Sequence, residues 1–450
     1  MPKIFLGVIL IIGISFFSFA QNNQPVGPFD LQTCVDIALE NNLTLKRTEL
    51  NQQITEANLL QSQGQRIPSF STGASSGYRW GRSINPVTNL FENNRIGNIN
   101  LFANSSAPIF RGNQINNTIS QARKDLEAGV FNLEATRNDI TLNIINLFIN
   151  VVFNREQVKI ATNQLKTTTE QFERTSKLVA AGSLPISDQL DLQSQNSSNQ
   201  LEVIRAQNNY RIAKLNLAQA MQIPFTDDFD VIEPEFNVEN STMVSEDPNA
   251  IYEVAVELMP EIKAAEAGVE SAEYQVKIAK GAFLPTLGIG ANLFSNYVDQ
   301  PGFNQREITP FGEQIQNNIS QSANLQLNIP IFSNFNNKSA VQRARAQKAI
   351  SEVTVQEAKN QLRQNIESAY TDAVASKLSY EASLVRVKSL QESFRVSQQR
   401  FDLGAINSVD FQVAQANLFN AQADLLNAKY TYIFRIKVLD FYLGNPINLN

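Results

Sequence analysis

The chain contains the same arrangement twice. Gly182 and Asp188 recur as Gly404 and Asp410, both 222 residues later, and a polar–apolar helical run follows each pair. Further matches keep an offset of 217 or 222 residues: IALENNLTL with VAVELMPEI, QRIPSF with AFLPTL, APIF with IPIF, and AQNNYRIAKLNL with AKYTYIFRIKVL. Self-similarity over half the chain predicts a duplicated structural unit. A fold for this chain must therefore accommodate two copies of one supersecondary pattern.

Each unit has the same order of parts: a helix, two strands, a very long helix, the Gly–Asp motif and a final helix. The first unit (21–220) is predicted to have helices over Leu31–Gln63, 113–181 and up to residue 220, strands over about 67–80 and 98–110, and its motif at 182–188. The second (249–443) is predicted to have helices over Ile251–Lys280, 334–403 and up to 443, strands over about 284–297 and 318–332, and its motif at 404–410. A linker (221–248) broken by prolines joins the units, and 444–450 is a tail.

The first twenty residues predict a secretory signal peptide. Lys3 precedes an apolar stretch over Ile4–Phe19 that is too short to span a membrane, and Ala20 ends a small-residue cleavage site. Without Lys3, 36 Lys and Arg oppose 43 Asp and Glu, so the mature chain carries a net charge of −7. An acidic exported chain without a basic patch predicts no nucleic-acid partner.

The residues of the common active sites are missing. The chain has no histidine, which excludes Ser-His-Asp and Cys-His catalysis and histidine metal sites. Its one cysteine, Cys34, permits no intrachain disulfide and is interpreted as a small apolar residue on a helix face. No acidic run has metal-ligand spacing, and no glycine-rich phosphate loop is present. We therefore expect neither an enzyme nor a metal or cofactor site.

The four predicted strands alternate between apolar and polar residues, which is typical of half-buried strands. One interpretation is a soluble antiparallel sheet on a core. The other is a membrane barrel with a polar lumen, in which Tyr78, Trp80 and Tyr297 form an aromatic girdle and Gly81–Gly97 and Val298–Asn317 are exposed loops. Four strands cannot close a barrel, so this second interpretation needs several chains.

The two long helices carry a narrow polar stripe. Its positions in the first copy are Asp139, Asn143, Asn146, Asn150 and Asn154, and the residues 222 positions later are Gln361, Asn365, Ser368, Asp372 and Ser376. A solvated face of a helical bundle explains such a stripe. We favour a wall helix with one strip facing a water-filled lumen, because the stripe is narrow and repeated.

The Gly–Asp motif lies where each long helix ends and the next begins. Gly182 and Gly404 suit a helix C-terminus with positive φ, and Pro185 suits the first turn of the following helix. Candidate N-caps are Ser187 or Asp188 in the first copy and Asn407, Ser408 or Asp410 in the second. The motif thus predicts the tips of two helical hairpins.

Together, the export signal, the duplication, the two strand pairs, the long helices and the hairpin tips resemble the TolC family of outer-membrane efflux proteins. The resemblance implies a mainly α protein with a small β part. In it, three copies contribute four strands each to a 12-stranded β-barrel, continued by a periplasmic α-barrel with an equatorial girdle. It further implies a homotrimer in outer-membrane lipid, and a periplasmic adaptor and inner-membrane pump that open the tips. Drug efflux, metal efflux and protein secretion share such a duct.

The resemblance also assigns roles at the tips, where aspartates form rings that narrow the pore. The matching position is Asp410, and Asp191 is a further candidate lining residue. In the family, a tyrosine before the tip glycine bonds the aspartate matching Asp188, but Phe401 stands here. A basic residue and a second acid are replaced by Ile406 and Val413, so the family's latch is expected to differ in this chain.

Two alternatives remain from the sequence. An exported coiled-coil scaffold or adhesion protein, with the strands as a soluble cap, accounts for the repeat and the helices. An exported enzyme using carboxylates is disfavoured by the missing histidine and by the duplicated tips.

Overall fold

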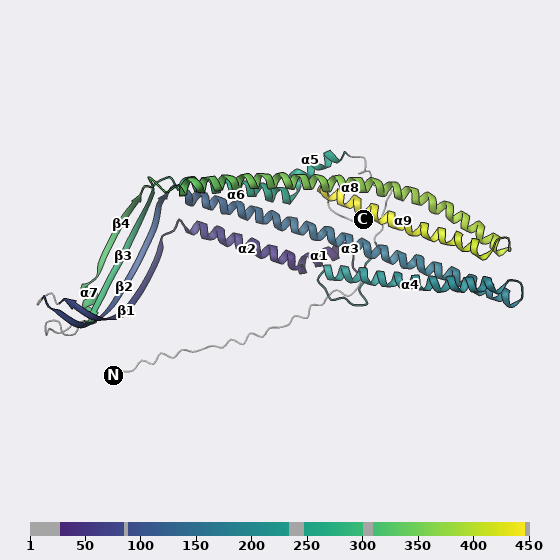
Figure 1. Cartoon of the computed structure of the whole chain (residues 1–450), viewed down its shortest axis with the longest axis horizontal. Helices are drawn as coiled ribbons and strands as arrows, with labels where there is room; N and C mark the ends of the chain where they lie inside the picture. Colours follow the sequence, from purple (N-terminus) through teal and green to yellow (C-terminus); the bar gives the residue numbers. More distant parts are fainter. Residues whose placement is uncertain (1–27, 85–88, 234–246, 300–308, 446–450) are drawn as a thin grey trace, which may run out of the picture.

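A computed structural model describes residues 28–84, 89–233, 247–299 and 309–445. The predicted signal peptide, most of the linker (234–246) and the end of the tail (446–450) lie outside the described residues. The elements are α1 (Leu31–Asn41), α2 (Leu43–Gly64), β1 (Ser69–Ile84), β2 (Phe91–Arg111), α3 (Gln114–Ala180), α4 (Ile186–Ala220), α5 (Pro248–Leu258), α6 (Pro260–Gly281), β3 (Thr286–Asp299), α7 (Phe311–Asn317), β4 (Ser320–Asn328), α8 (Asn336–Asp402) and α9 (Ser408–Tyr442). The molecule is elongated, with the sheet at one end and two helical tips at the other (Figure 1).

Two equally long helices form the framework. α3 and α8 contain 67 residues each, which corresponds to about 100 Å at 1.5 Å per residue. Their hairpin partners α4 and α9 contain 35 residues each. The equal lengths in the two halves bear out the duplicated unit and the mainly α fold with a small β part.

The first helical segment of each unit is broken, where the sequence analysis predicted one continuous helix. Asn42 separates α1 from α2, and its Oδ1 accepts the N–H groups of Thr44 at 2.8 Å and Leu45 at 3.1 Å. In the second copy Met259 adopts an extended conformation, and Pro260 begins α6. The breaks arise because a capping asparagine and a proline both favour a new helix start.

The strands form one antiparallel sheet in the order β1-β2-β3-β4. β1 and β2 are longer than predicted, so most of Gly81–Gly97 is strand and not loop. Part of the expected second loop is the helix α7, which is tied to β3 because the Gln314 side chain bonds both backbone groups of Val298 at 3.1 Å. β4 ends at Asn328, short of the predicted residue 332.

The register divides the sheet into an apolar and a polar face. Phe70, Ala291 and Ala323 share one row, and Ile289 and Leu325 share the next row on the same face. The opposite face carries mostly serine, glycine and asparagine, as in the row Ser71, Asn104, Asn292 and Ser322. A register shift between Pro108 and Phe110 leaves Ile109 without a partner in β3 and places Phe110 opposite Leu287.

The main hydrophobic core joins α1, α3, α4 and α9 to the segment that follows α4. Phe148, Leu217 and Phe229 are buried there, and Ile366 and Leu439 belong to a second core between α5, α8 and α9. Each fully buried side chain of this size contributes about 1.5–3 kcal/mol. Apolar packing therefore holds the middle of the helical body together. In the described ranges, no helix is both long and apolar enough to cross a membrane.

Candidate functional site

Both hairpin tips have the same backbone geometry. Gly182 and Gly404 adopt φ values of 76° and 69°, the positive values expected. After α3, the N–H of Gly182 donates to Val179 O at 2.9 Å and the N–H of Ser183 donates to Leu178 O at 2.8 Å. The N–H groups of Gly404 and of the next residue repeat this pattern after α8, at 3.0 and 2.8 Å. These paired bonds are the Schellman ending of a helix, which requires a left-handed residue.

The two tips differ in how the second helix starts. Asn407 caps α9, since its Oδ1 accepts the N–H of Asp410 at 2.8 Å. At the first tip Pro185 is the N-cap residue of α4, although it was expected in the first turn of the helix. No side chain caps α4. The candidate caps Ser187 and Asp188 were wrong, because Pro185 already turns the chain and its carbonyl accepts the N–H of Asp188 at 3.2 Å.

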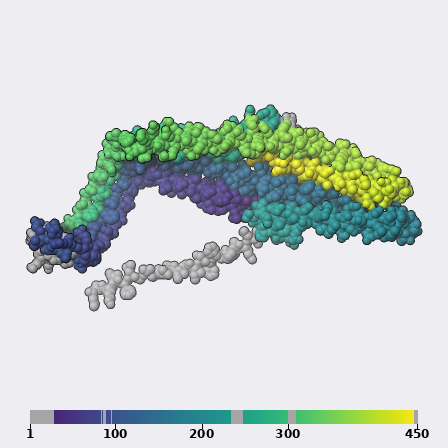
Figure 2. Space-filling view, in the orientation of Figure 1, coloured from purple at the N-terminus to yellow at the C-terminus, as the bar shows by residue number. Residues whose placement is uncertain are grey.

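The tips enclose a cavity of about 400 Å³ between the two hairpins. Asp188 lines it from the first hairpin, and Phe401 and Ile406 line it from the second. Asp191 and Asp410 are exposed and do not belong to this lining. In the space-filling view the ends of the two hairpins lie side by side at the tip end of the molecule (Figure 2). Of the predicted acidic residues, the structure thus brings only Asp188 into the shared cavity.

An ion pair between the hairpins lies beside this cavity. Arg174 Nη1 of α3 is 2.6 Å from Asp402 Oδ1 of α8, although the residues are 228 positions apart in sequence. Both residues line the cavity. No local signal in the sequence predicts this pair, because none shows which residues of two separate hairpins meet.

Phe401, for which the resemblance implied a different tip contact, lies near the end of α8. Its ring stacks on Phe411, with ring centroids 4.8 Å apart and planes at 20°, and Phe411 also contacts Phe394 at 5.6 Å. The stack joins α8 to α9 and keeps the second hairpin closed. Phe401, which can make no hydroxyl contact, thus packs within its own hairpin.

The seam between the hairpins is polar where it is buried. Thr168 Oγ1 of α3 accepts Asn199 Nδ2 of α4 at 2.7 Å and Gln415 Nε2 of α9 at 3.2 Å. These three side chains are 0%, 4% and 2% exposed. Thr175 and Gln171 of α3 are also buried nearby along the helix. Buried hydrogen bonds centred on Thr168 therefore take part in the contact between the hairpins.

The polar stripe of the first copy lies on the surface of the chain. Asn143, Asn146 and Asn150 are exposed, whereas Ile144 and Phe148 between them are buried. Asn154 extends the row, because its Nδ2 donates to Asn150 Oδ1 at 2.8 Å. One narrow side of α3 is thus hydrated while the rest packs against neighbouring helices.

In the second copy the stripe continues only in part. Asn365 and Ser368 are exposed, but Asp372 is half-buried and pairs with Arg435 of α9 at 3.1 Å. Ser376 is buried, and its hydroxyl donates to Asp372 O at 2.6 Å. The prediction of a solvent-facing residue was wrong for Ser376, because α9 packs over this turn of α8.

The three aromatic residues predicted for a girdle share the apolar face of the sheet. Tyr78 and Trp80 are 56% and 71% exposed, with ring centroids 5.8 Å apart. Tyr297 of β3 is half-buried and packs against Phe311 of α7, with ring centroids 5.3 Å apart. All three lie toward the end of the sheet that is remote from the long helices (Figure 1).

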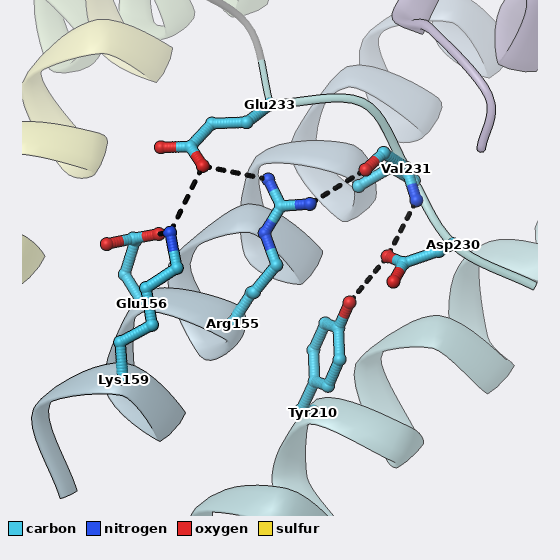
Figure 3. A network of polar contacts seen from close by, with 7 residues as sticks. All are labelled: Arg155, Glu156, Lys159, Tyr210, Asp230, Val231 and Glu233. Carbon is cyan, nitrogen blue, oxygen red and sulfur yellow. Dashed lines mark hydrogen bonds and ion pairs between the residues drawn. The ribbon is translucent and has the colours of Figure 1, made fainter. Parts of the chain in front are cut away.

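A charged network fastens the segment after α4 to α3 (Figure 3). Arg155 Nη1 donates to Val231 O at 2.8 Å, and its Nη2 lies 3.4 Å from Glu233. Lys159 lies 3.2 Å from the same carboxylate and also pairs with Glu156. Two cations on successive turns of α3 therefore hold one carboxylate of the linker.

The same segment clasps the first described residues of the chain. Tyr210 donates its hydroxyl proton to Asp230 Oδ1 at 2.5 Å, and burial, followed by this hydrogen bond, raises the pKa of Tyr210. Phe29 forms a parallel bridge with Val231, with Phe29 N donating to Asp230 O at 2.9 Å. The tyrosine stays protonated and fixes the linker in the middle of the helical body.

The described residues contain no group of three or more His, Cys, Asp or Glu side chains arranged to hold a metal ion. One cavity lies between the hairpin tips, a second lies between α8 and α9, and a third lies on the sheet. What the geometry offers is an edge-exposed sheet, a hydrated helix face and two adjacent tips.

Comparison with known proteins identifies the family. The model of the family described as "Outer membrane efflux protein" matches residues 34–221 and 251–445. The alkaline protease secretion protein AprF of Pseudomonas aeruginosa is 22% identical over 330 residues, which are 72% of this chain and 66% of AprF. The outer membrane protein TolC of Escherichia coli is 22% identical over 301 residues, or 67% of this chain and 60% of TolC. The chain thus spans less than two thirds of the length of these curated relatives.

A solved structure supports the same fold over a larger share of both chains. CusC, described in a study of transmembrane channel formation, superposes with a TM-score of 0.78 and 17% identity over 95% of this chain and 96% of its own. These findings confirm the resemblance drawn from the sequence. Because the family model covers both repeats, the chain belongs to the outer membrane efflux protein family, a family of channel proteins, and is a protein of the outer membrane.

Proposed function

We propose that this protein is a passive homotrimeric exit duct, gated at its helical tips and opened by a periplasmic adaptor and an inner-membrane pump. The observation that carries the proposal is that, in the described residues, β1 and β4 lie at the edges of the sheet, and α4 and α8 lie at the outside of the helices near the tips. A duct of this kind moves cargo with energy supplied by its partners and performs no chemistry of its own.

The sheet supplies the first pair of edges. Among the strands that the structure describes, β1 bonds only to β2 and β4 bonds only to β3, so this sheet has two open outer edges. The strands alternate in direction, so β4 of one copy would run antiparallel to β1 of the next. Exposed strand edges are avoided in stable proteins, and ring closure removes them. Three copies of four strands make a closed twelve-stranded barrel.

The helices supply the second pair of edges. Between the middle of the helical body and the tips, α8 packs on α9, α9 packs on α3 and α3 packs on α4. This order leaves α4 and α8 at the outside. Both carry apolar side chains that are more than one third exposed at helical spacing: Leu190, Leu201 and Ile204 on α4, and Leu378, Val385 and Val396 on α8. The α4 row of one copy is suited to the α8 row of the next. Burying such rows is the main favourable contribution to association.

The two faces of the sheet match lipid and water. On the apolar face Phe70, Leu325 and Leu327 are 75%, 64% and 60% exposed in the single chain. Lipid-facing residues of membrane barrels are apolar, with aromatic residues at the interfaces, and the lumen is polar. We therefore assign the apolar face to lipid, the serine- and asparagine-rich face to the lumen, and Tyr78, Trp80 and Tyr297 to one interface.

The tips supply the gate. Arg174 and Asp402 join the two hairpins of one copy across the shared cavity, and the polar seam above them can exchange its hydrogen bonds for water. Asp410 is exposed in the first turn of α9, where three copies would place carboxylates around one axis. Such a ring produces a focused negative field that attracts cations. The hydrated row Asn143, Asn146 and Asn150 would line the wider lumen.

The test is the native mass of the mature protein in mild detergent, followed by conductance in planar bilayers. We expect a detergent-requiring trimer whose block by divalent cations weakens in Asp410→Ala. The matched control is Glu202→Ala, which removes an exposed carboxylate of α4 away from the tip. A water-soluble monomer or dimer would contradict the duct and leave the coiled-coil scaffold.

A further inference from the structure

One row of the polar face of the sheet is aromatic. Phe102 of β2 lies directly opposite Phe294 of β3, with Gly73 beyond Phe102 and Ser320 beyond Phe294. The adjacent rows on this face contain Asn104 with Asn292, and Asn100 with Asn296. An apolar pair is thus set between two bands of asparagine.

The asparagine bands are tied to the wall of the sheet. Asn100 Nδ2 donates to Ser75 Oγ at 3.3 Å, and Asn292 Nδ2 donates to Ser322 Oγ at 3.4 Å. Their amides are thereby held near the backbone and leave the aromatic row accessible from the centre. Phe294 is 39% exposed in the single chain.

The ring of Phe102 packs over Gly73 of β1, which has no side chain. Its ring atom Cζ lies 2.5 Å from the point where a Cβ of Gly73 would stand, so any larger residue there would collide with the ring. This contact alone gives Phe102 a structural role. It does not account for Phe294, which faces Ser320 on its other side and has no glycine to cover.

We propose that Phe102 and Phe294 form an aromatic contact site inside the lumen, which binds the aromatic or apolar parts of cargo in transit. The proposal rests on the trimeric duct, because only closure of the sheet turns its polar face into a lumen. Three copies place six phenylalanine rings at one level of a twelve-stranded wall. A barrel of this size lies between eight-stranded barrels, which side chains fill, and the wide porins, so large side chains reach into the path.

The chemistry selects amphiphilic molecules. Asparagine above and below the rings hydrates polar groups, whereas the ring faces accept apolar surface and attract cations weakly. A molecule with both aromatic surface and positive charge therefore binds at this level, whereas a small hydrated ion gains no binding energy from the rings. The site gives the duct a preference within its cargo without any conformational change.

The experiment uses the full-length mature trimer in planar bilayers and two probes of equal charge. Tetraphenylphosphonium carries four aromatic rings, and tetraethylammonium carries none. We expect tetraphenylphosphonium to block current at lower concentration than tetraethylammonium in the unmodified protein. In F102S/F294S the blocking concentration should rise about tenfold, as expected for loss of aromatic contacts of roughly 1.4 kcal/mol. The block by tetraethylammonium should not change.

The matched control is N100S/N292S, which shortens side chains in the adjacent rows without removing aromatic surface, and it should retain block by tetraphenylphosphonium. If F102S proves unstable because Gly73 is uncovered, F294S alone is informative and should weaken the block about threefold. Equal block in F294S and the unmodified trimer would overturn the aromatic site while leaving the duct intact. Absence of conductance in the unmodified protein would overturn both.

Discussion

Gln415 of α9 donates its side-chain N–H to the hydroxyl of Thr168 in α3 at 3.2 Å, across 247 positions of sequence. The same hydroxyl oxygen accepts Asn199 Nδ2, so one buried threonine joins three helices. A hydrogen bond contributes only about 1 kcal/mol net, but a buried donor left without an acceptor costs about 1–3 kcal/mol. The junction therefore sets the register of the hairpins, and it is replaceable by water when they separate.

Thr168→Val tests this junction, because valine keeps the shape and removes the acceptor. We expect the free energy of unfolding to fall by about 1–3 kcal/mol, since Asn199 and Gln415 lose their shared partner. Denaturant unfolding of the detergent-solubilised trimer measures the change. Thr167→Val is the control, because that hydroxyl bonds only within α3, to Asn163 O at 3.0 Å. Equal effects of the two substitutions would mean that the junction does not couple the hairpins.

The ion pair of Arg174 with Asp402 should affect the gate more than stability. Its side chains are 50% and 33% exposed, and pairs of this kind contribute under about 1 kcal/mol. We expect R174D to raise the open fraction in single-channel recordings, since two carboxylates then repel across the cavity. The double exchange R174D/D402R should restore the closed state.

The control for this prediction is Arg205→Asp. Arg205 pairs with Glu202 one turn away on the same helix, so its loss separates no hairpins. The difference in open fraction between R174D and the unmodified protein should become smaller at high salt, because salt screens exposed charges. An open fraction unaffected by R174D would remove the pair from the gate.

The glycines predict two opposite effects of the same substitution. Gly404 has φ of 69° with open space around its Cβ position, so Gly404→Ala should cost about 1–2 kcal/mol through backbone strain alone. Gly268 lies inside α6 with equally open space, and Gly268→Ala should stabilise the protein by about 0.5–1 kcal/mol. Unfolding midpoints in detergent measure both. The strain argument fails if Gly404→Ala is neutral.

Cys34 predicts a loss of stability in alkali. Burial, followed by the negative charge of Asp30, raises the pKa of the Cys34 thiol to about 12. In the unfolded chain a thiol ionises near pH ~8.5. Between these two values the unfolded state releases a proton that the folded state keeps, so the free energy of unfolding falls as pH rises.

The measurement compares the unmodified protein with Cys34→Ala at pH 8 and pH 10. The stability advantage of the unmodified protein should be smaller at pH 10, because alanine cannot ionise. N-ethylmaleimide at pH 8 should label Cys34 in denaturant and leave it unlabelled in the folded trimer, since its side chain is 0% exposed. Rapid labelling of the folded protein would contradict both the burial and the raised pKa.

Local sequence patterns predict most of the elements and their order. Strand alternation, helical length and positive φ at Gly182 and Gly404 depend on residues close in the chain, so local patterns predict them, and the duplication allowed each pattern to be read twice. Local reasoning failed where two signals competed: Asn42 and Met259 interrupt segments that otherwise read as continuous helix.

The contacts between the hairpins follow from the packing of the whole fold. Arg174 pairs with Asp402, Ser376 is buried under α9, and Phe102 lies opposite Phe294. In each case the partners belong to separate elements. The relative register of two helices or strands follows from the packing of the whole interface, and a shift of one position would change every such contact. A local pattern does not predict that register. The contacts at the tips and on the polar face of the sheet therefore cannot be predicted without the fold.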